Sequence, residues 1–446
     1  MRSELDQVRS STSQVLGRRL EPRRWSLCVW SKADRGWVLD GLWLGYLLKS
    51  WGSVTILLGR VVLVLSQVVI LVLVARFEGA AEVGRYTLAL AICSPVLVFA
   101  HFRLRDYLSS HPVDYYRLSK YLRSQMIVGV SGAVVVVAAA SLIYDIEFGL
   151  LVGALAISKI VENSIFCANG LAARAGRHFA MSVSTIIRAL LNVISIFIGM
   201  LTFGLAFGLL LTAFFWTVQF ILYDRRLADS GIENSPGRNV DSQLSLVSLL
   251  TLGASAFLTL LSPTLVRIAL EAFGSLEALG RFAIAAYYVR IGSVLFQSIG
   301  QGSATQISSY VVSREKDLLF RLVRRLVLLS LGFSVISGVI LVAVGAPVLA
   351  FAFGPDARPD RSLLFAISVV AIFVFANTAI AIPAVAIVPS RRFAVYNLIA
   401  ALFTIVTGPI LILKWGAVGA GYTWAVAAAV QFFLVGIHVR MWRSAS

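Results

Sequence analysis

The stretch ARFEGAAEVGR at residues 75–85 joins two apolar runs, and ALEAFGSLEALGR at residues 269–281 joins two more. At an offset of 196 residues the two joints align on a phenylalanine, a glycine and an arginine, which are Phe77, Gly84 and Arg85 in the first copy and Phe273, Gly280 and Arg281 in the second. This alignment predicts one helical hairpin that the chain uses twice.

The composition places both hairpins in a membrane. Of the 446 residues 59% are hydrophobic and only 14% are charged, with a mean hydropathy of +0.86. Soluble domains are about 45–50% apolar, so we predict an all-α polytopic membrane protein. Runs of roughly 20 apolar residues suffice to cross the bilayer. About twelve such runs occur, near 54–75, 86–102, 124–143, 148–168, 179–199, 204–223, 245–266, 282–303, 326–345, 362–388, 393–413 and 416–439.

The repeat extends over both halves of the chain. At an offset of 214 residues Asn163 falls on Asn377, in the fourth and tenth runs. Each half holds six runs, an even number, so the repeats are parallel and a central cavity is expected between them. The predicted parts are an N-terminal cytoplasmic extension, a first six-helix bundle, a cytoplasmic linker and a second bundle with a short tail, at 1–50, 51–226, 227–244 and 245–446.

Basic residues alternate between the loops in the way that twelve spans require. The N-terminal segment, the even-numbered loops and the C-terminus hold 28 Lys and Arg, and the opposite side holds seven, which are Arg76, Arg85, Arg267, Arg281, Arg358, Arg361 and Lys414. Short cytoplasmic loops are enriched in Lys and Arg, so we expect both termini and the linker in the cytoplasm. The membrane topology then explains most of the net charge of +17, and no nucleic-acid partner is expected.

The sequences of the second and eighth runs resemble a known family. AEVGRYTLALAICSPVLVFAHFRLRDYLSS at 81–110, LGRFAIAAYYVRIGSVLFQSIGQGSATQIS at 279–308 and FGPD at 353–356 are similar to bacterial polysaccharide-lipid flippases such as the O-antigen flippases. These belong to the multidrug, oligosaccharidyl-lipid and polysaccharide exporter superfamily. The resemblance implies a MATE-like fold in the bacterial inner membrane, an undecaprenyl-pyrophosphate-linked oligosaccharide as substrate, and a polysaccharide polymerase and other glycan-assembly proteins as partners beside the membrane lipids.

Charged residues inside the predicted spans are the candidate site. A basic residue at mid-bilayer costs about 2.5–3.5 kcal/mol, so each should face a partner or a wet cavity. Lys159 and Glu162, the one acid placed firmly inside a span, are three residues apart on one helix face and close enough to pair. Two interpretations of this pair stay open, an internal salt bridge and a direct role in ion or substrate handling.

Three arginines have no acidic neighbour in their own spans, namely Arg60, Arg188 and Arg290. Guanidinium groups bind phosphate bidentately, so we predict that these arginines bind the substrate's pyrophosphate. Gln297 and Gln301 follow Arg290 on a polar stripe that we expect to face the cavity. The alternatives are arginines that snorkel to the interface or bond neighbouring carbonyls, and glutamines that pack between helices.

No nucleotide-binding loop, metalloprotease motif or nucleophile elbow occurs in the sequence, and no cofactor or metal site is expected. We therefore predict a flippase that is not an enzyme. A cation-coupled multidrug or small-molecule antiporter is the alternative, and it predicts acids in the cavity. A membrane glycan polymerase or ligase is the alternative of another class, and it would need carboxylates on the external face, where residues such as Asp145, Glu147 and Glu82 are available.

Overall fold

The structure is a computed structural model that describes residues 51–110, 115–229, 232, 246–313, 315–388 and 390–444. The predicted extension 1–50 and nearly all of the predicted linker 227–244 lie outside these ranges. The part described is helical, with no strands. Its elements are α3 (Trp51–Ala100), α4 (Leu104–Ser110), α5 (Tyr115–Ile143), α6 (Ile146–Arg174), α7 (His178–Thr202), α8 (Leu205–Gln219), η1 (Phe220–Asp224), α9 (Arg225–Asp229), α10 (Leu246–Phe273), α11 (Leu276–Gly302), α12 (Ala304–Val312), α13 (Lys316–Phe353), α14 (Arg361–Ile387) and α15 (Ser390–Ser444).

Ten of the described helices are long and apolar enough to cross a membrane. Two of these, α3 and α15, are each a pair of helices joined at a kink, at Gly79 (φ 88°) and Gly416 (φ 54°). Both φ values lie in the left-handed region, which glycine adopts at little cost. Counting the two halves of α3 and α15 separately gives the twelve passes that the sequence predicts, so the expected fold class is confirmed for the described residues.

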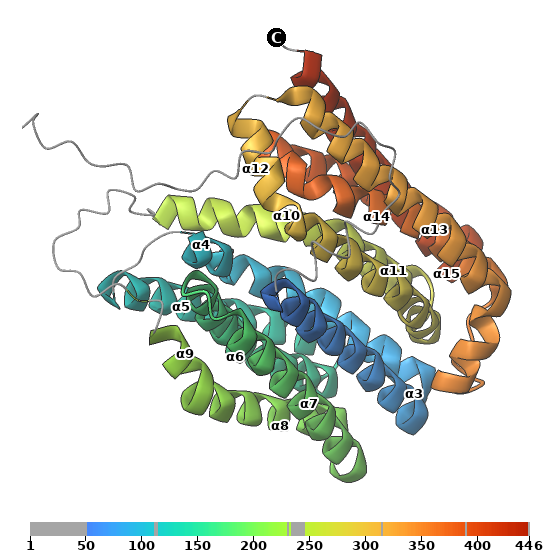
Figure 1. Cartoon of the computed structure of the whole chain (residues 1–446). Helices are drawn as coiled ribbons and strands as arrows, with labels where there is room; N and C mark the ends of the chain where they lie inside the picture. Colours follow the sequence, from blue (N-terminus) through green and yellow to red (C-terminus); the bar gives the residue numbers. More distant parts are fainter. Residues whose placement is uncertain are drawn as a thin grey trace, which may run out of the picture. The chain divides into compact units, whose positions relative to one another are not determined.

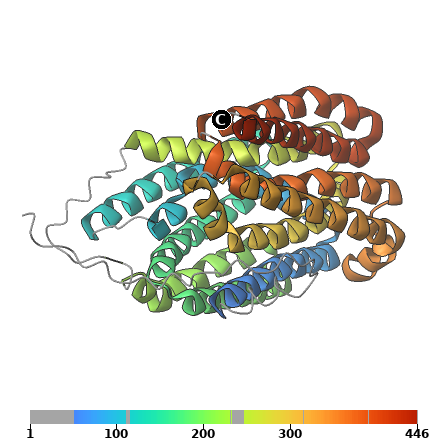
Figure 2. The same cartoon turned by 45° about the horizontal axis from the view of Figure 1, so that its top comes forward.

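The two halves of the chain use the same helix pairings. In the first half α3 packs against α7, and α5 against α6; in the second half α10 packs against α15, and α13 against α14. The halves meet mainly where α3 lies beside α10 and α11, as the blue and yellow helices of Figure 1 and the second view in Figure 2 show. α3, α10 and α11 are therefore the main elements that face the other half.

The two joints of the repeat are in direct contact. A Cβ built on Gly84 would overlap the carbonyl group of Leu276, and a Cβ built on Gly280 would overlap the carbonyl group of Ala80. The offset of 196 residues that pairs Gly84 with Gly280 also pairs Ala80 with Leu276. Each contact is therefore the repeat image of the other, as expected for two parallel repeats that meet across a pseudo-twofold axis.

The two asparagines that the repeat aligns, Asn163 and Asn377, both form hydrogen bonds between helices. The Asn163 side chain donates to Leu97 O at 3.1 Å, and the Asn377 side chain donates to Ala428 O at 2.8 Å. Their acceptors lie on α3 and α15, which are not equivalent in the repeat. Both asparagines therefore form a hydrogen bond to another helix, but the two bonds are not equivalent in the repeat.

Two predicted helix ends are wrong. Helix α10 runs to Phe273, so Arg267 lies inside a candidate span and not in the loop where its charge suggested a boundary. The sixth span, predicted to end at residue 223, continues through η1 and α9, so Asp224 is inside the helical segment with no exposed surface. Hydropathy alone ends a helix at the first charge, whereas a polar partner in the fold lets the helix continue.

We predict that Gly84→Ala or Gly280→Ala lowers the thermal stability of the detergent-solubilised protein. Overpacking a close contact costs about 1–3 kcal/mol, and here backbone rather than a movable side chain opposes the new Cβ. Gly332→Ala is the matched control, because nothing lies within 4 Å of a Cβ at that position of α13. Unchanged melting of both joint variants would contradict a tight crossing.

Candidate functional site: a charged cluster between the two bundles

Glu162 on α6 is held by two cations. Lys159 Nζ lies 2.7 Å from Glu162 Oε2, the contact that the spacing along the helix predicts. Arg188 Nη1, from α7, lies 3.6 Å from Glu162 Oε1. The sequence indicated no acidic partner for Arg188 because that partner is on another helix. A carboxylate with an 8% exposed side chain thus has a cation on each oxygen.

The Arg188 side chain is enclosed within the first bundle and is only 1% exposed. Its guanidinium carbon lies 4.6 Å from the centre of the Phe166 ring and 5.8 Å from that of Trp216. Trp216 Nε1 also donates to the Arg188 carbonyl oxygen at 3.1 Å. Aromatic faces stabilise a cation that water does not reach. In this conformation Arg188 binds Glu162 and not a ligand in a cavity.

A second buried acid, Asp224, lies in the first bundle and interacts with Arg188. Asp224, at the end of the π-helix η1, accepts a hydrogen bond of 2.6 Å from Ser184 Oγ and interacts electrostatically with Arg188. Gln219 Nε2 donates to the Ser184 carbonyl oxygen at 2.9 Å. Single turns of π-helix are frequent at functional sites. Sequence reasoning missed Asp224 because the apolar run ends just before it.

The second bundle contributes cations without acids. Arg267 on α10 is half-buried, Arg290 on α11 is exposed, and both interact electrostatically with Tyr287 and with each other. Among the described residues neither arginine has an ion pair or a hydrogen bond. Two like charges with no acid in contact with them are unfavourable inside a candidate membrane span. This place is therefore suited to an anion.

Tyrosines connect the two sets of charges. Tyr86 on α3 is buried and interacts electrostatically with Glu162 and with Tyr287, and Glu162 in turn interacts with Arg290. We call these residues the interbundle cluster: Tyr86, Lys159, Glu162, Arg188, Arg267, Tyr287 and Arg290. Its four cations and one carboxylate leave an excess of three positive charges, or two when Asp224 beside Arg188 is counted with them. This charge balance favours an anionic ligand over a cationic one.

The other predicted site residues lie on the helices that face the opposite half. Arg60 is half-buried on α3, and Gln297 is exposed on α11, two turns after Arg290 and so on the same helix face. Gln301 is within α11, but its side chain is outside the described residues. Within the described ranges no group of three His, Cys, Asp or Glu side chains could hold a metal ion.

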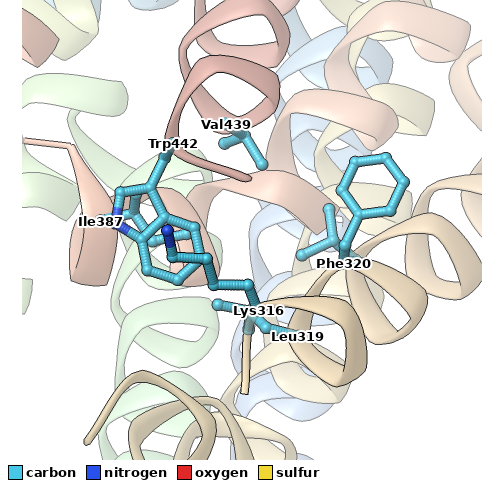
Figure 3. Close-up of a pocket in the computed structure, with 7 residues that line it drawn as sticks. Lys316, Leu319, Phe320, Ile387, Val439 and Trp442 are labelled. Atoms are coloured by element: carbon cyan, nitrogen blue, oxygen red, sulfur yellow. The ribbon is translucent and has the colours of Figure 1, made fainter. Parts of the chain in front are cut away.

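Figure 3 shows a hollow that shares no residue with the interbundle cluster. Apolar side chains from the start of α13 and the ends of α14 and α15 line it, with Lys316 Nζ 5.4 Å from the Trp442 ring centre. One cation beside six aliphatic or aromatic side chains offers little to a polar substrate. We therefore place the candidate site in the cluster and not here.

The bundles are tied together at the end where the two joints lie, which we call the joint end. Arg76 Nε donates to Ala352 O at 3.0 Å, and Tyr144 Oη donates to Glu271 Oε2 at 2.9 Å. Burial and the hydrogen bond to Glu271 raise the pKa of Tyr144 to about 12. Tyr144 therefore keeps its proton near neutral pH and continues to donate. Both contacts join the first half of the chain to the second.

Carboxylates at the joint end surround one arginine. Arg85 lies 3.5 Å from Glu82, 3.7 Å from Asp145 and 3.6 Å from Glu147. These are acids that a membrane polymerase or ligase would need free on its external face. Their contacts with Arg85 favour a structural role at the joint end.

Known proteins share this fold. No protein-family model matches the chain. The Staphylococcus aureus capsular polysaccharide biosynthesis protein CapF is 21% identical over 323 residues, which cover 70% of this chain and 79% of that protein. A MOP superfamily transporter from Pyrococcus furiosus superposes with a TM-score of 0.63 at 14% identity, covering 88% of this chain and 94% of that one. The Vibrio cholerae MATE transporter VcmN in its bent form gives 0.58 at 13% identity, covering 91% and 98%. The chain thus has the MOP transporter fold that its sequence resembles.

We predict that Arg188→Met lowers the stability of the protein by about 3–5 kcal/mol, because it leaves the buried Glu162 with one cation fewer. Arg188→Met combined with Glu162→Gln should cost less than Arg188→Met alone. Thermal melting of the purified variants measures both. Arg226→Met, on the exposed surface of α9, is the control and should change stability little. A fully stable Arg188→Met variant would show that Glu162 does not need this partner.

Proposed function

We propose that this chain, which has the fold of MOP superfamily transporters, is a flippase and not an enzyme. Its substrate would be an undecaprenyl-pyrophosphate-linked oligosaccharide, a repeat unit of O-antigen, exopolysaccharide or capsule, moved from the inner to the outer leaflet of the cytoplasmic membrane. Three observations support this proposal: the fold, the likeness to a capsular polysaccharide biosynthesis protein, and the excess positive charge of the interbundle cluster.

The observation that supports the substrate class concerns Arg267 and Arg290, which form neither an ion pair nor a hydrogen bond with any residue that the structure describes. A pyrophosphate group offers several anionic oxygens, and planar guanidinium groups bind such oxygens in pairs. Its charge would offset the repulsion between the two arginines. The lipid tail can stay in the bilayer while only the polar head enters between the bundles.

The position of the cluster suits transport by alternating access. Residues of both bundles would hold the same anion, so rocking one bundle against the other exposes it first on one side and then on the other. From the positive-inside count we infer that both termini lie in the cytoplasm and the joint end lies outside. The joint-end contacts would then close the outer side in this conformation. A polymerase on the outer face would consume the flipped repeat unit.

A cation-coupled multidrug antiporter is the second candidate, since several structural neighbours are MATE transporters and the first bundle buries two acids, Glu162 and Asp224. However, Glu162 is neutralised by two cations, and Asp224 is enclosed behind Arg188. A cationic drug would meet the excess positive charge of the cluster. The charge balance therefore favours an anionic substrate.

We predict that Arg290→Ala and Arg267→Ala each reduce flipping of an undecaprenyl-pyrophosphate-linked sugar about 10- to 100-fold. One charge-assisted hydrogen bond is worth about 1.5–3 kcal/mol, which corresponds to that range. The rate is measured in proteoliposomes, with surface glycan in a complemented deletion strain as the cellular readout. Arg358→Ala, in the exposed turn between α13 and α14, is the matched control. Wild-type rates for both cluster variants at normal membrane abundance would refute the arginine site.

We also predict that linking residues 144 and 271 stops transport. Cysteines at both positions, in a background without Cys28, Cys93 and Cys167, are joined by a short reducible bifunctional reagent. Because the Tyr144–Glu271 contact joins the two halves at the joint end, the linked protein cannot open there. Reduction of the linker should restore flipping, and each single-cysteine variant treated with the reagent should stay active. Undiminished flipping by the linked protein would exclude opening at this end.

A further inference from the structure

The two cations on Glu162 differ in how freely they can move. Arg188 is enclosed by Phe166 and Trp216 and has almost no exposed surface. Lys159 lies on the same helix as Glu162, and 28% of its side chain is exposed. A lysine has a long flexible stem and one compact charge, so it can change partner without a backbone movement. Arg188 is thus the fixed partner of Glu162, and Lys159 is the movable one.

Glu162 can lose Lys159 without being left alone. Removing both cations from a buried carboxylate would leave an uncompensated charge, which is costly. If Lys159 turns away, Arg188 Nη1 remains 3.6 Å from the other carboxylate oxygen. The arrangement therefore permits Lys159 to leave, which a single isolated Lys–Glu pair would not.

An anion on the second bundle would offer Lys159 a new partner. Glu162 interacts electrostatically with Arg290, so the charges of the first and second bundles belong to one cluster. Arg290 and Arg267 have no ion pair among the described residues. A ligand phosphate bound by these arginines competes with Glu162 for Lys159.

We propose that Glu162 is an internal counter-anion, which occupies Lys159 while the transporter is empty and releases it to the phosphate groups of the substrate. This inference rests on the proposed function, whose substrate has a pyrophosphate head. Glu162 is then a specificity-determining residue. A lipid with two phosphate groups offers Lys159 enough charge to leave Glu162, a lipid with one offers less, and a neutral lipid offers none.

Binding to the purified full-length chain in detergent tests this inference. The probes are undecaprenyl pyrophosphate, undecaprenyl monophosphate and undecaprenol. The wild type should bind the pyrophosphate most tightly. Glu162→Gln frees Lys159 in advance, so both phosphate lipids should bind about tenfold more tightly, with the larger gain for the monophosphate. The gain should disappear when Lys159→Met is added to Glu162→Gln.

A purely structural salt bridge makes the opposite prediction. Glu162→Gln would then lower the thermal stability of the protein. The variant would bind each of the three lipids more weakly than the wild type does, or no more tightly. A gain that persists with Lys159→Met would also overturn the inference. If Glu162→Gln fails to fold, Glu162→Asp decides, because the shorter acid keeps its charge but reaches less far toward Lys159. Its phosphate-lipid affinity should rise by a smaller factor, and an unchanged or lower affinity refutes the inference.

Failure of the inference and failure of the proposed function give different results. If the wild type binds the pyrophosphate lipid and Arg290→Ala weakens that binding, the proposed substrate class stands whatever the Glu162 variants show. If the wild type binds undecaprenyl pyrophosphate no better than undecaprenol, the proposed function fails and the role of Glu162 fails with it.

Discussion

The close contact between the two joints is the constraint on which the rest of the structure depends. Backbone meets backbone at residues 84 and 280 because neither residue has a Cβ. The contact sets how closely α3 and α11 approach, and these helices form much of the boundary between the bundles. A small-residue contact of this kind suits a membrane, where close packing replaces the hydrophobic effect as the force between helices. The cluster can form between the bundles because the joints fix their approach at one end.

Both bundles are built from the same repeat, but each charged residue of the interbundle cluster occurs in only one of the two copies. Gln219 bonds Ser184 in the first bundle and Gln431 bonds Asn397 in the second, which are similar contacts between corresponding helices of the repeat. The charged residues of the interbundle cluster have no such counterparts. In the order Lys159, Glu162, Arg188, Arg267 and Arg290, the residues at the repeat-equivalent positions are Phe373, Ala376, Leu402, Leu71 and Ser94. The symmetric contacts therefore hold the fold, and the asymmetric charges make a site that is neutralised on one side and cationic on the other.

Features that depend on the pattern of residues along the chain could be predicted from the sequence. Contacts that depend on how one helix is turned about its axis toward another could not. The hairpin repeat, the spans and the Lys159–Glu162 pair follow from periodicity along one chain segment. The contact of Arg188 with Glu162 depends on how α7 is turned toward α6, which no spacing within either helix reveals. Asp224 and Arg267 were misplaced because each charge marked a helix end in hydropathy, whereas Ser184 and Tyr287 supply polar surroundings that let the helix continue.

A transport site must release its ligand as well as bind it. Four cations without a counter-charge would hold a pyrophosphate strongly on both sides of the membrane, and tight binding in both states moves nothing. The carboxylate of Glu162 lowers the net charge that the ligand meets and offers Lys159 an alternative partner. Arg188 holds that carboxylate in place in this conformation, so the competing anion stays beside Lys159. On the proposed mechanism the one acid of the cluster would matter to transport as much as the arginines, since departure of the ligand requires something to take its place.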